Sequence, residues 1–245
     1  SYWPVYEDSI NRKWDGSTSK SPSAKFGEAF GITDLEDKVS QHHGIDHFRS
    51  SRKECETNSD CDGETQNAKG SCVKREGEAE DAKGVCIPTW WGICHAWAPA
   101  AIMEKEPIKE VVHNGVTFKV NDLKALVTLS YTAGLSVEFI SLRCNKSNAA
   151  AEITYGDYGI PVSDDKECAD TNAGTFHVLA TNLLGIQKRS FVEDRTFDIE
   201  VWNQPVRSFQ VTKSAPLTAN QANELLGANS TEGAYLFNDE AVSFQ

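Results

Sequence analysis

The sequence lacks any long apolar segment. Among its 245 residues, no apolar run approaches the roughly 20 that an α-helix needs to cross a bilayer. The opening residues, Ser1-Tyr2-Trp3-Pro4, also lack the charged and apolar regions of a signal peptide, so the sequence reads as a matured chain. We therefore expect no insertion into a membrane.

Positive charge is scarce. The chain has 24 lysine and arginine residues against 36 aspartate and glutamate residues, which gives a formal net charge of -12. A surface that binds nucleic acid needs an excess of basic side chains to meet the phosphates. The composition therefore argues against a nucleic-acid partner, while the length suffices for one large domain or two small ones.

Closely spaced cysteine pairs are also missing, although cysteines are not. None of the seven cysteines forms the C-x₂₋₄-C pair that zinc sites favour. Four of them lie within residues 52–88, a polar stretch that has almost nothing to bury and needs cross-links to stay ordered. We therefore expect a disulfide-rich insert and a secreted, extracellular protein. Glycosylation sequons at Asn145 and Asn229 agree with secretion as a glycoprotein.

An odd number of cysteines leaves one thiol unpaired. The spacing within the insert favours two pairs among three connectivities, and the two later loop cysteines can pair with each other. The predicted disulfides are Cys55–Cys72, Cys61–Cys86 and Cys144–Cys168. Cys94 is then the free thiol.

Cys94 has the surroundings of a nucleophile. It opens an apolar segment, C-H-A-W-A-P-A-A-I-M, that predicts a helix, and the dipole at the start of a helix stabilises a reactive thiolate. Trp90 and Trp91 precede it and are expected to bind substrate, and with Trp97 they could keep water away from an acyl-enzyme. The alternatives are a buried structural cysteine and tryptophans that pack in the core, which we favour for Trp97.

A nucleophilic cysteine needs an imidazole as its base. His95 is adjacent in sequence and would point about 100° away on a helix. His177 opens the apolar run H-V-L-A-T-N-L-L-G-I, which we interpret as a strand, directly after a turn of small residues. We therefore expect His177 to be the base, with a half-buried structural histidine as the alternative.

A third group should orient that imidazole. The following segment, F-D-I-E-V-W-N-Q-P-V, alternates as a strand, and Pro205 is expected to end it. Alternation places Asn203 on the same, buried face as Val201 and Asp198 on the other face. Asn203 is therefore the predicted third member, and Asp198 is the alternative.

The remaining pattern predicts an α+β fold. Residues 21–31 predict a helix that Gly31 ends, and Asn114-Gly115 predicts a hairpin turn. Asn121 or Asp122 is expected to cap a further helix. Thr218 to Gln221 form a capping box for the last one. The predicted parts are a helical N-terminal segment at 1–51, the cysteine-rich insert at 52–88 and a catalytic core at 89–245.

Two motifs resemble known families. The run W-G-I-C-H-A-W-A from Trp91 resembles the nucleophile motif of papain-like cysteine proteases. The run V-W-N-Q-P-V-R-S-F-Q-V at 201–211 resembles the defence-eliciting peptide of the secreted, calcium-dependent transglutaminases of plant-pathogenic oomycetes. The segments S-Y-W-P-V-Y and K-F-G-E-A-F-G also resemble that family, so the similarity extends over essentially the whole chain.

The resemblance implies an enzyme that cross-links the glutamine and lysine side chains of protein substrates. It implies a papain-like core in which the helix that bears the nucleophile packs on an antiparallel sheet. It also implies a calcium requirement and recognition of residues 201–213 by a plant cell-surface receptor. Trp202 is a further candidate for substrate binding, with a packing role as the alternative.

The sequence departs from these families at three points. Position 88 is proline, where papain-like proteases place a glutamine that helps to hold the oxyanion, so the second oxyanion donor is unidentified. Trp202 precedes Asn203, whereas the tryptophan of those proteases follows the asparagine. No EF-hand loop occurs, so the calcium ligands are unknown. Asp60-Cys61-Asp62 and Asp164-Asp165 are candidates, although a solvated surface is the favoured interpretation.

Two other functions stay open. A papain-like protease or amidase would use the same residues with water as the acceptor. A non-enzymatic secreted effector would act through residues 201–213 alone, and Cys94→Ser would then leave its activity intact.

Overall fold

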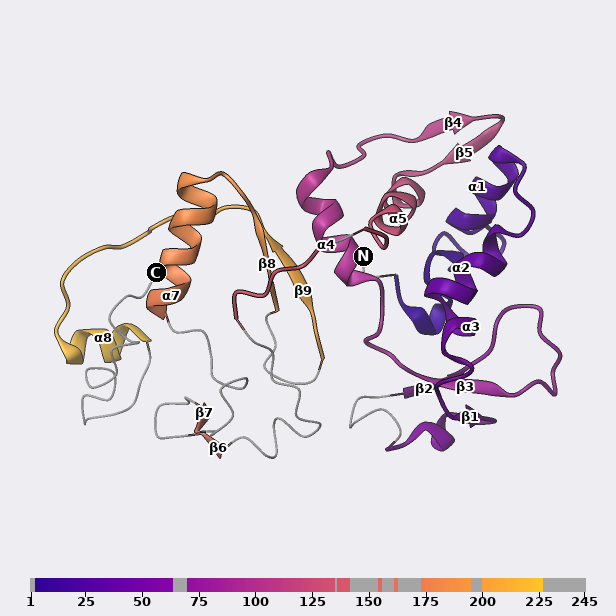
Figure 1. Cartoon of the computed structure of the whole chain (residues 1–245), viewed down its shortest axis with the longest axis horizontal. Coiled ribbons are helices and arrows are strands. Elements are labelled where there is room, and N and C mark those ends of the chain that lie inside the picture. Colours follow the sequence, from indigo (N-terminus) through magenta and orange to yellow (C-terminus); the bar gives the residue numbers. More distant parts are fainter. Residues whose placement is uncertain are drawn as a thin grey trace. The chain divides into compact units, whose positions relative to one another are not determined.

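The computed structural model describes residues 3–63, 70–134, 136–141, 154–155, 161–162, 173–194 and 200–226. The chain divides into two units. The first comprises residues 1–137, 194–196 and 200–204, and the second comprises 138–193, 197–199 and 205–245. The segment 89–245, predicted as one core, is therefore shared between both units, and each unit is described by itself. Helices alternate with small antiparallel strand pairs, which confirms the α+β class (Figure 1).

The N-terminal segment of the first unit is helical, as predicted. Two short 3₁₀ helices, Val5–Glu7 and Ser9–Asn11, precede α1 (Pro22–Phe30), α2 (Leu35–His43) and α3 (Ile45–Phe48). The hydroxyl of Ser21 accepts a hydrogen bond from the backbone N–H of Ala24 and so caps α1. Gly31 ends this helix with a φ of 71°, a left-handed conformation that glycine adopts without strain.

The cysteine-rich insert folds as a three-stranded antiparallel sheet in the order β1-β3-β2. Its strands are β1 (Glu54–Cys55), β2 (Gly70–Val73) and β3 (Gly84–Pro88), and β3 is buried throughout. Disulfides join Cys55 to Cys72 and Cys61 to Cys86, which are the two pairs that the spacing favours. The cross-links thus supplement a small apolar core, in which Val85 and Ile87 of β3 pack with Val5 and Ile45.

The hairpin and the helix after it follow the sequence closely. The strands β4 (Val111–His113) and β5 (Val116–Phe118) pair across Asn114 and Gly115, whose φ angles of 48° and 80° suit a tight two-residue turn. The helix α5 (Val120–Ser130) begins earlier than predicted, because Lys119 is its N-cap. Asp122 lies inside the first turn, where it accepts the backbone N–H of Lys119 at 2.7 Å.

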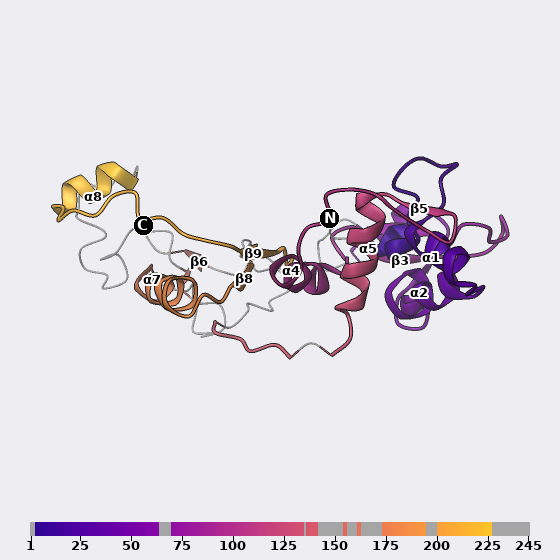
Figure 2. The same cartoon turned by 90° about the horizontal axis from the view of Figure 1, so that it is seen from above.

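The helix α4 (Cys94–Met103) packs against α5, which in turn contacts α1 (Figure 2). The helix α4 is partly buried, since Ala96, Ala98 and Ala100 are buried whereas His95 and Met103 are exposed. Pro99 lies deeper in this helix than the first turn, where a proline would be tolerated most easily. Its missing N–H leaves the carbonyl of His95 without the usual helical donor.

The second unit contains α7 (Ala173–Ala180), a π-helical stretch (Thr181–Ile186), α8 (Ala219–Leu226) and the paired short strands β6 (Thr154–Tyr155) and β7 (Pro161–Val162). The predicted capping box is present, since Gln221 and Thr218 exchange hydrogen bonds at the start of α8. The described part of the chain ends with this helix at Leu226. No helix in the described ranges is long and apolar enough to cross a bilayer.

Two strands late in the chain, β8 (Phe191–Asp194) and β9 (Asn203–Val206), form a two-stranded sheet. Pro205 lies within β9, whereas the sequence predicted that it would end the strand. The strand instead begins at Asn203. A proline is tolerated in a strand with an open edge, because no partner there requires its N–H.

Candidate functional site

Cys94 is the first residue of α4 and is only 9% exposed. Its thiol is free, and every other cysteine that the structure describes is in a disulfide. The first backbone bonds at this end of the helix come from the N–H groups of Ala96 and Trp97, which both donate to the carbonyl of Ile93 at 3.0 Å. The helix dipole at this end stabilises an anion that forms at the sulfur. The position therefore suits a nucleophile whose reaction develops negative charge.

The turn before Cys94 is held by the N-terminal segment. The backbone N–H of Val5 donates to the carbonyl of Trp91 at 2.8 Å, and Pro4 forms an isolated β-bridge with Gly92. Ile93 is buried in the core cluster that contains Trp3. Two segments almost ninety positions apart in sequence thus fix the start of α4.

A late segment of the same unit, residues 200–204, supplies the polar contacts of the thiol. The Cys94 Sγ donates to the carbonyl oxygen of Val201 over 3.7 Å. The Asn203 Nδ2 donates to Sγ over 3.6 Å. A hydrogen-bond acceptor and a hydrogen-bond donor therefore flank the sulfur, and both come from the run that resembles the eliciting peptide.

Two carboxylates that precede Trp202 in the chain hold this segment in place. The backbone N–H of Trp202 donates to Asp194 Oδ1 at 2.9 Å, and the indole Nε1 of Trp202 donates to Glu200 Oε2 at 2.9 Å. Asp194 could not be predicted from the sequence, because an aspartate at the end of a strand gives no sign of its distant partner. Its contact with the residue before Asn203 makes it a positioning residue for the segment.

The tryptophans near the thiol are partly engaged in packing. Trp91 contacts Phe48 with ring centroids 4.9 Å apart, and the guanidinium of Arg52 lies 4.2 Å from the Trp91 ring centroid, a cation–π distance. Trp90 meets Trp91 edge-on at 6.2 Å, and both are half-buried. Trp97 and Trp202 are also half-buried. A substrate-binding role stays a prediction for Trp90, Trp91 and Trp202.

His177 belongs to the second unit and lies on α7, so the predicted strand is wrong at this point. The half-buried side chain shares one helical face with Ala180 and Leu184, three and seven positions on. The hydroxyl of Thr181 donates to the His177 carbonyl at 2.8 Å, where α7 passes into the π-helical stretch. Asp198, the alternative third member, lies outside the described residues, as do Cys144 and Cys168.

Two histidines of the first unit, His43 and His95, have lowered pKa values. Burial lowers the pKa of His43 below 6.5, and His42, His95 and His47 lower it further through charge repulsion. The surrounding protein also lowers the pKa of His95 by desolvating its ring. Both imidazoles are therefore neutral near pH 7.

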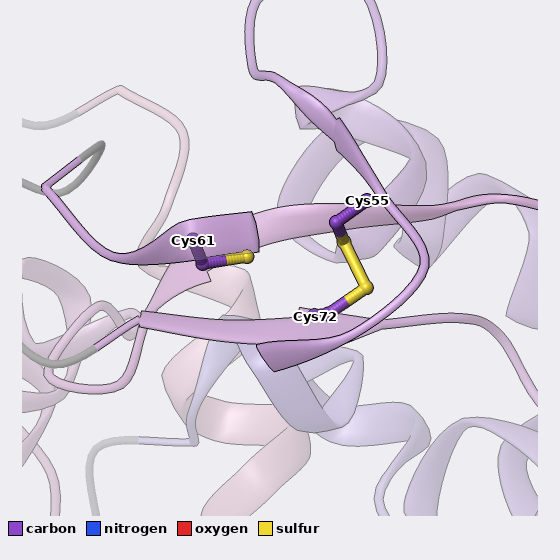
Figure 3. Close-up of side chains that lie close together, drawn as sticks. All are labelled: Cys55, Cys61 and Cys72. Carbon is purple, nitrogen blue, oxygen red and sulfur yellow. A yellow bond between two sulfur atoms is a disulfide. The ribbon is translucent and has the colours of Figure 1, made fainter. Parts of the chain in front are cut away.

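Potential metal ligands of the His, Cys, Asp and Glu types gather at one point of the described residues. Within them, one group of three potential ligands lies close together, namely Cys55, Cys61 and Cys72 (Figure 3). These sulfurs are consumed in disulfides, and calcium prefers oxygen ligands. The Asp60 carboxylate instead accepts the backbone N–H groups of Thr57 and Glu56 at 2.8 and 2.9 Å. Asp164-Asp165 lies outside the described residues.

Comparison with known proteins gives a family match and a structural match. The family model described as transglutaminase elicitor matches residues 1–245. The crystal structure of the GP42 transglutaminase from Phytophthora sojae is similar, with a TM-score of 0.66 and 38% sequence identity. The alignment covers 91% of this chain and 56% of that chain, so this chain corresponds to little more than half of the solved protein. No curated protein sequence matches.

Proposed function

The chain belongs to the transglutaminase elicitor family, and from this membership we propose that it is a protein-glutamine γ-glutamyltransferase with Cys94 as its nucleophile. The family match over the whole chain carries the proposal. The 38% identity to the GP42 transglutaminase supports it, and so does the free thiol at the start of α4, which is flanked by a donor and an acceptor. The papain-like core remains part of the proposal.

In the first half of the proposed reaction, the Cys94 thiolate attacks the γ-carboxamide carbon of a substrate glutamine. The carbon–nitrogen bond then breaks, and His177 gives a proton to the departing ammonia. The product is a thioester between Cys94 and the glutamyl group. The position of Cys94 at the N-terminus of α4 supports this step, because the helix dipole stabilises negative charge.

In the second half, a substrate lysine attacks the thioester. A free lysine amine has a pKa near 10.4, so His177 must remove a proton from it at neutral pH. The carbon–sulfur bond breaks, an isopeptide bond forms, and the Cys94 thiolate is released. Asn203, with Asp198 as the alternative, would accept the ring N–H of His177 and fix its orientation.

The decisive experiment is the incorporation of a labelled primary amine into a glutamine-bearing protein. We expect Cys94→Ala and His177→Ala to abolish incorporation while circular dichroism shows a native fold. Peptide hydrolysis that outpaces amine transfer at millimolar amine would replace this proposal with a cysteine protease or amidase.

The calcium requirement rests on the resemblance alone. The described residues assign no ligands to the ion, and no reaction step depends on it here. We expect a calcium chelator to stop amine incorporation and added calcium to restore it. Full activity in the chelator would remove calcium from the proposal.

A second function, elicitation of plant defence, is supported by exposure. Residues 207–218 are exposed in the structure, so the later part of the run at 201–213 is open to a plant cell-surface receptor of a secreted protein. We expect a synthetic peptide of residues 201–213 to trigger a defence response in plant cells. If Cys94→Ser keeps that response but loses amine incorporation, recognition and catalysis are separate properties.

A further inference from the structure

The contacts of the Cys94 sulfur change when the thiol ionises. In the thiol, S–H donates to the Val201 carbonyl, and Sγ accepts from Asn203 Nδ2. Loss of the proton removes the first bond and leaves the carbonyl oxygen facing a negative sulfur. The second bond becomes charge-assisted and strengthens. Asn203 is therefore the neighbour that favours the thiolate.

The same amide is close to where an acyl oxygen would gain charge. In a tetrahedral intermediate the oxyanion is bonded to the carbon that is itself bonded to Sγ. The oxyanion therefore lies two covalent bonds from the sulfur, close to a donor that contacts Sγ. A carboxamide nitrogen carries two N–H donors, and one contact with Sγ leaves the other N–H available. Donors aimed at a developing oxyanion are among the strongest contributions to catalysis.

Position 88 cannot provide such a donor. Pro88 is fully buried at the end of β3, and a proline has neither a side-chain amide nor a backbone N–H. The first turn of α4 supplies one donor through the Cys94 backbone N–H. A second must come from elsewhere, and Asn203 is the side-chain amide that contacts the sulfur.

We propose that Asn203 acts on the sulfur side of the reaction: its Nδ2 stabilises the Cys94 thiolate and then donates to the oxyanion of the tetrahedral intermediate. This role rests on the proposed function, in which Cys94 is the nucleophile. It differs from orienting the imidazole, since it uses the N–H groups of the amide and not its oxygen. The bond from Trp202 to Asp194 fixes the start of β9 and so aims this amide.

The two roles are separated by Asn203→Asp, which keeps the shape and the acceptor but replaces the donor with a negative charge. The first measurement is the rate at which iodoacetamide alkylates Cys94 as a function of pH, in protein whose disulfides are intact. We expect the midpoint of the profile to rise by at least one pH unit. The second measurement is amine incorporation, which should fall by about 10²–10³-fold, as for loss of an oxyanion donor.

An aspartate could still accept an imidazole N–H. Amine incorporation within about 10-fold of wild type and an unchanged alkylation profile would therefore show that Asn203 only orients the base, and would overturn the proposal. Gln204→Glu is the matched control, because it makes the same change of charge at the next position, whose side chain points to the other face of β9. We expect Gln204→Glu to move the midpoint of the alkylation profile by less than half of the shift caused by Asn203→Asp.

If Asn203→Asp fails to fold, Asn203→Ala decides the question. It removes the donor without adding charge and should also move the alkylation midpoint upward, whereas an unchanged midpoint would refute the role. Alkylation does not depend on transglutamination. If the Asn203 variants shift the alkylation midpoint but the wild-type protein incorporates no amine, Asn203 still stabilises the Cys94 thiolate and the proposed function is rejected.

Discussion

Asp122 shows how a single buried charge joins distant parts of the first unit. Its carboxylate is fully buried and accepts hydrogen bonds from Trp14 Nε1 at 2.8 Å and from Lys25 Nζ at 2.5 Å. The backbone N–H of Lys119 completes its partners at 2.7 Å. Because every bond leads to a different segment, the loss of this carboxylate would loosen all three.

Asp122→Ala should lower the free energy of unfolding by about 3–5 kcal/mol, because it leaves the largely buried Lys25 ammonium without its partner. Urea unfolding followed by tryptophan fluorescence measures the change. Glu28→Ala is the control, since its pair with Lys20 is exposed and should contribute less than about 1 kcal/mol. Equal effects of the two substitutions would show that Asp122 has no special role.

Much of the candidate site could be predicted residue by residue, but its contacts could not. The odd cysteine count and the glycine–tryptophan context predicted Cys94 as the free thiol, and alternation singled out Asn203. Neither signal contains the distance from an amide nitrogen to a sulfur 109 positions away. That contact depends on the course of residues 200–204, which the Trp202–Asp194 bond fixes in the folded chain.

At the scale of elements, turns and caps were predictable because their chemistry is local. Gly31, the Asn114-Gly115 turn and the Thr218 capping box appear where the sequence places them. The segment of His177 was predicted wrongly as a strand, because a continuous apolar run fits either a strand or a buried helix. Burial does not alternate along this segment as it would in a strand, since Leu179, Ala180 and Thr181 are consecutive and none of them is exposed.

His43 of α2 makes the first unit sensitive to acid. His43 has a folded pKa below the ordinary 6.5, because it is buried and next to other histidines. At pH values between the lowered pKa of folded His43 and the ordinary 6.5 of the unfolded chain, the unfolded chain binds more protons. The free energy of unfolding therefore falls as the pH falls through this window. Above pH 6.5 the contribution is fully present.

His43→Gln should therefore reduce the loss of unfolding free energy between pH 7.5 and pH 5. Urea unfolding at several pH values in this range measures the slope for the wild type and the variant. Identical slopes would mean that the acid sensitivity arises at other groups.

For the whole molecule, the odd number of cysteines predicts a single reactive thiol. The structure describes Cys94 as free and pairs four other cysteines, and Cys144–Cys168 remains the predicted third disulfide. Alkylation without reduction, followed by peptide mapping, should label Cys94 alone. A label on any second cysteine would contradict the pairing. The division into two units was not predictable, because no shift in composition marks residue 137.

The bridge between Pro4 and Gly92 joins a segment that is synthesised early to one that is synthesised much later. The N-terminal segment leaves the ribosome long before its partner, and all four cysteines of the insert are made between them. Cys94 follows Cys86 by only eight residues, so its thiol emerges while the slower disulfides of the insert are still forming. The N-terminal segment is already available when Gly92 is made, so burial of Cys94 beside this bridge withdraws the thiol from disulfide exchange.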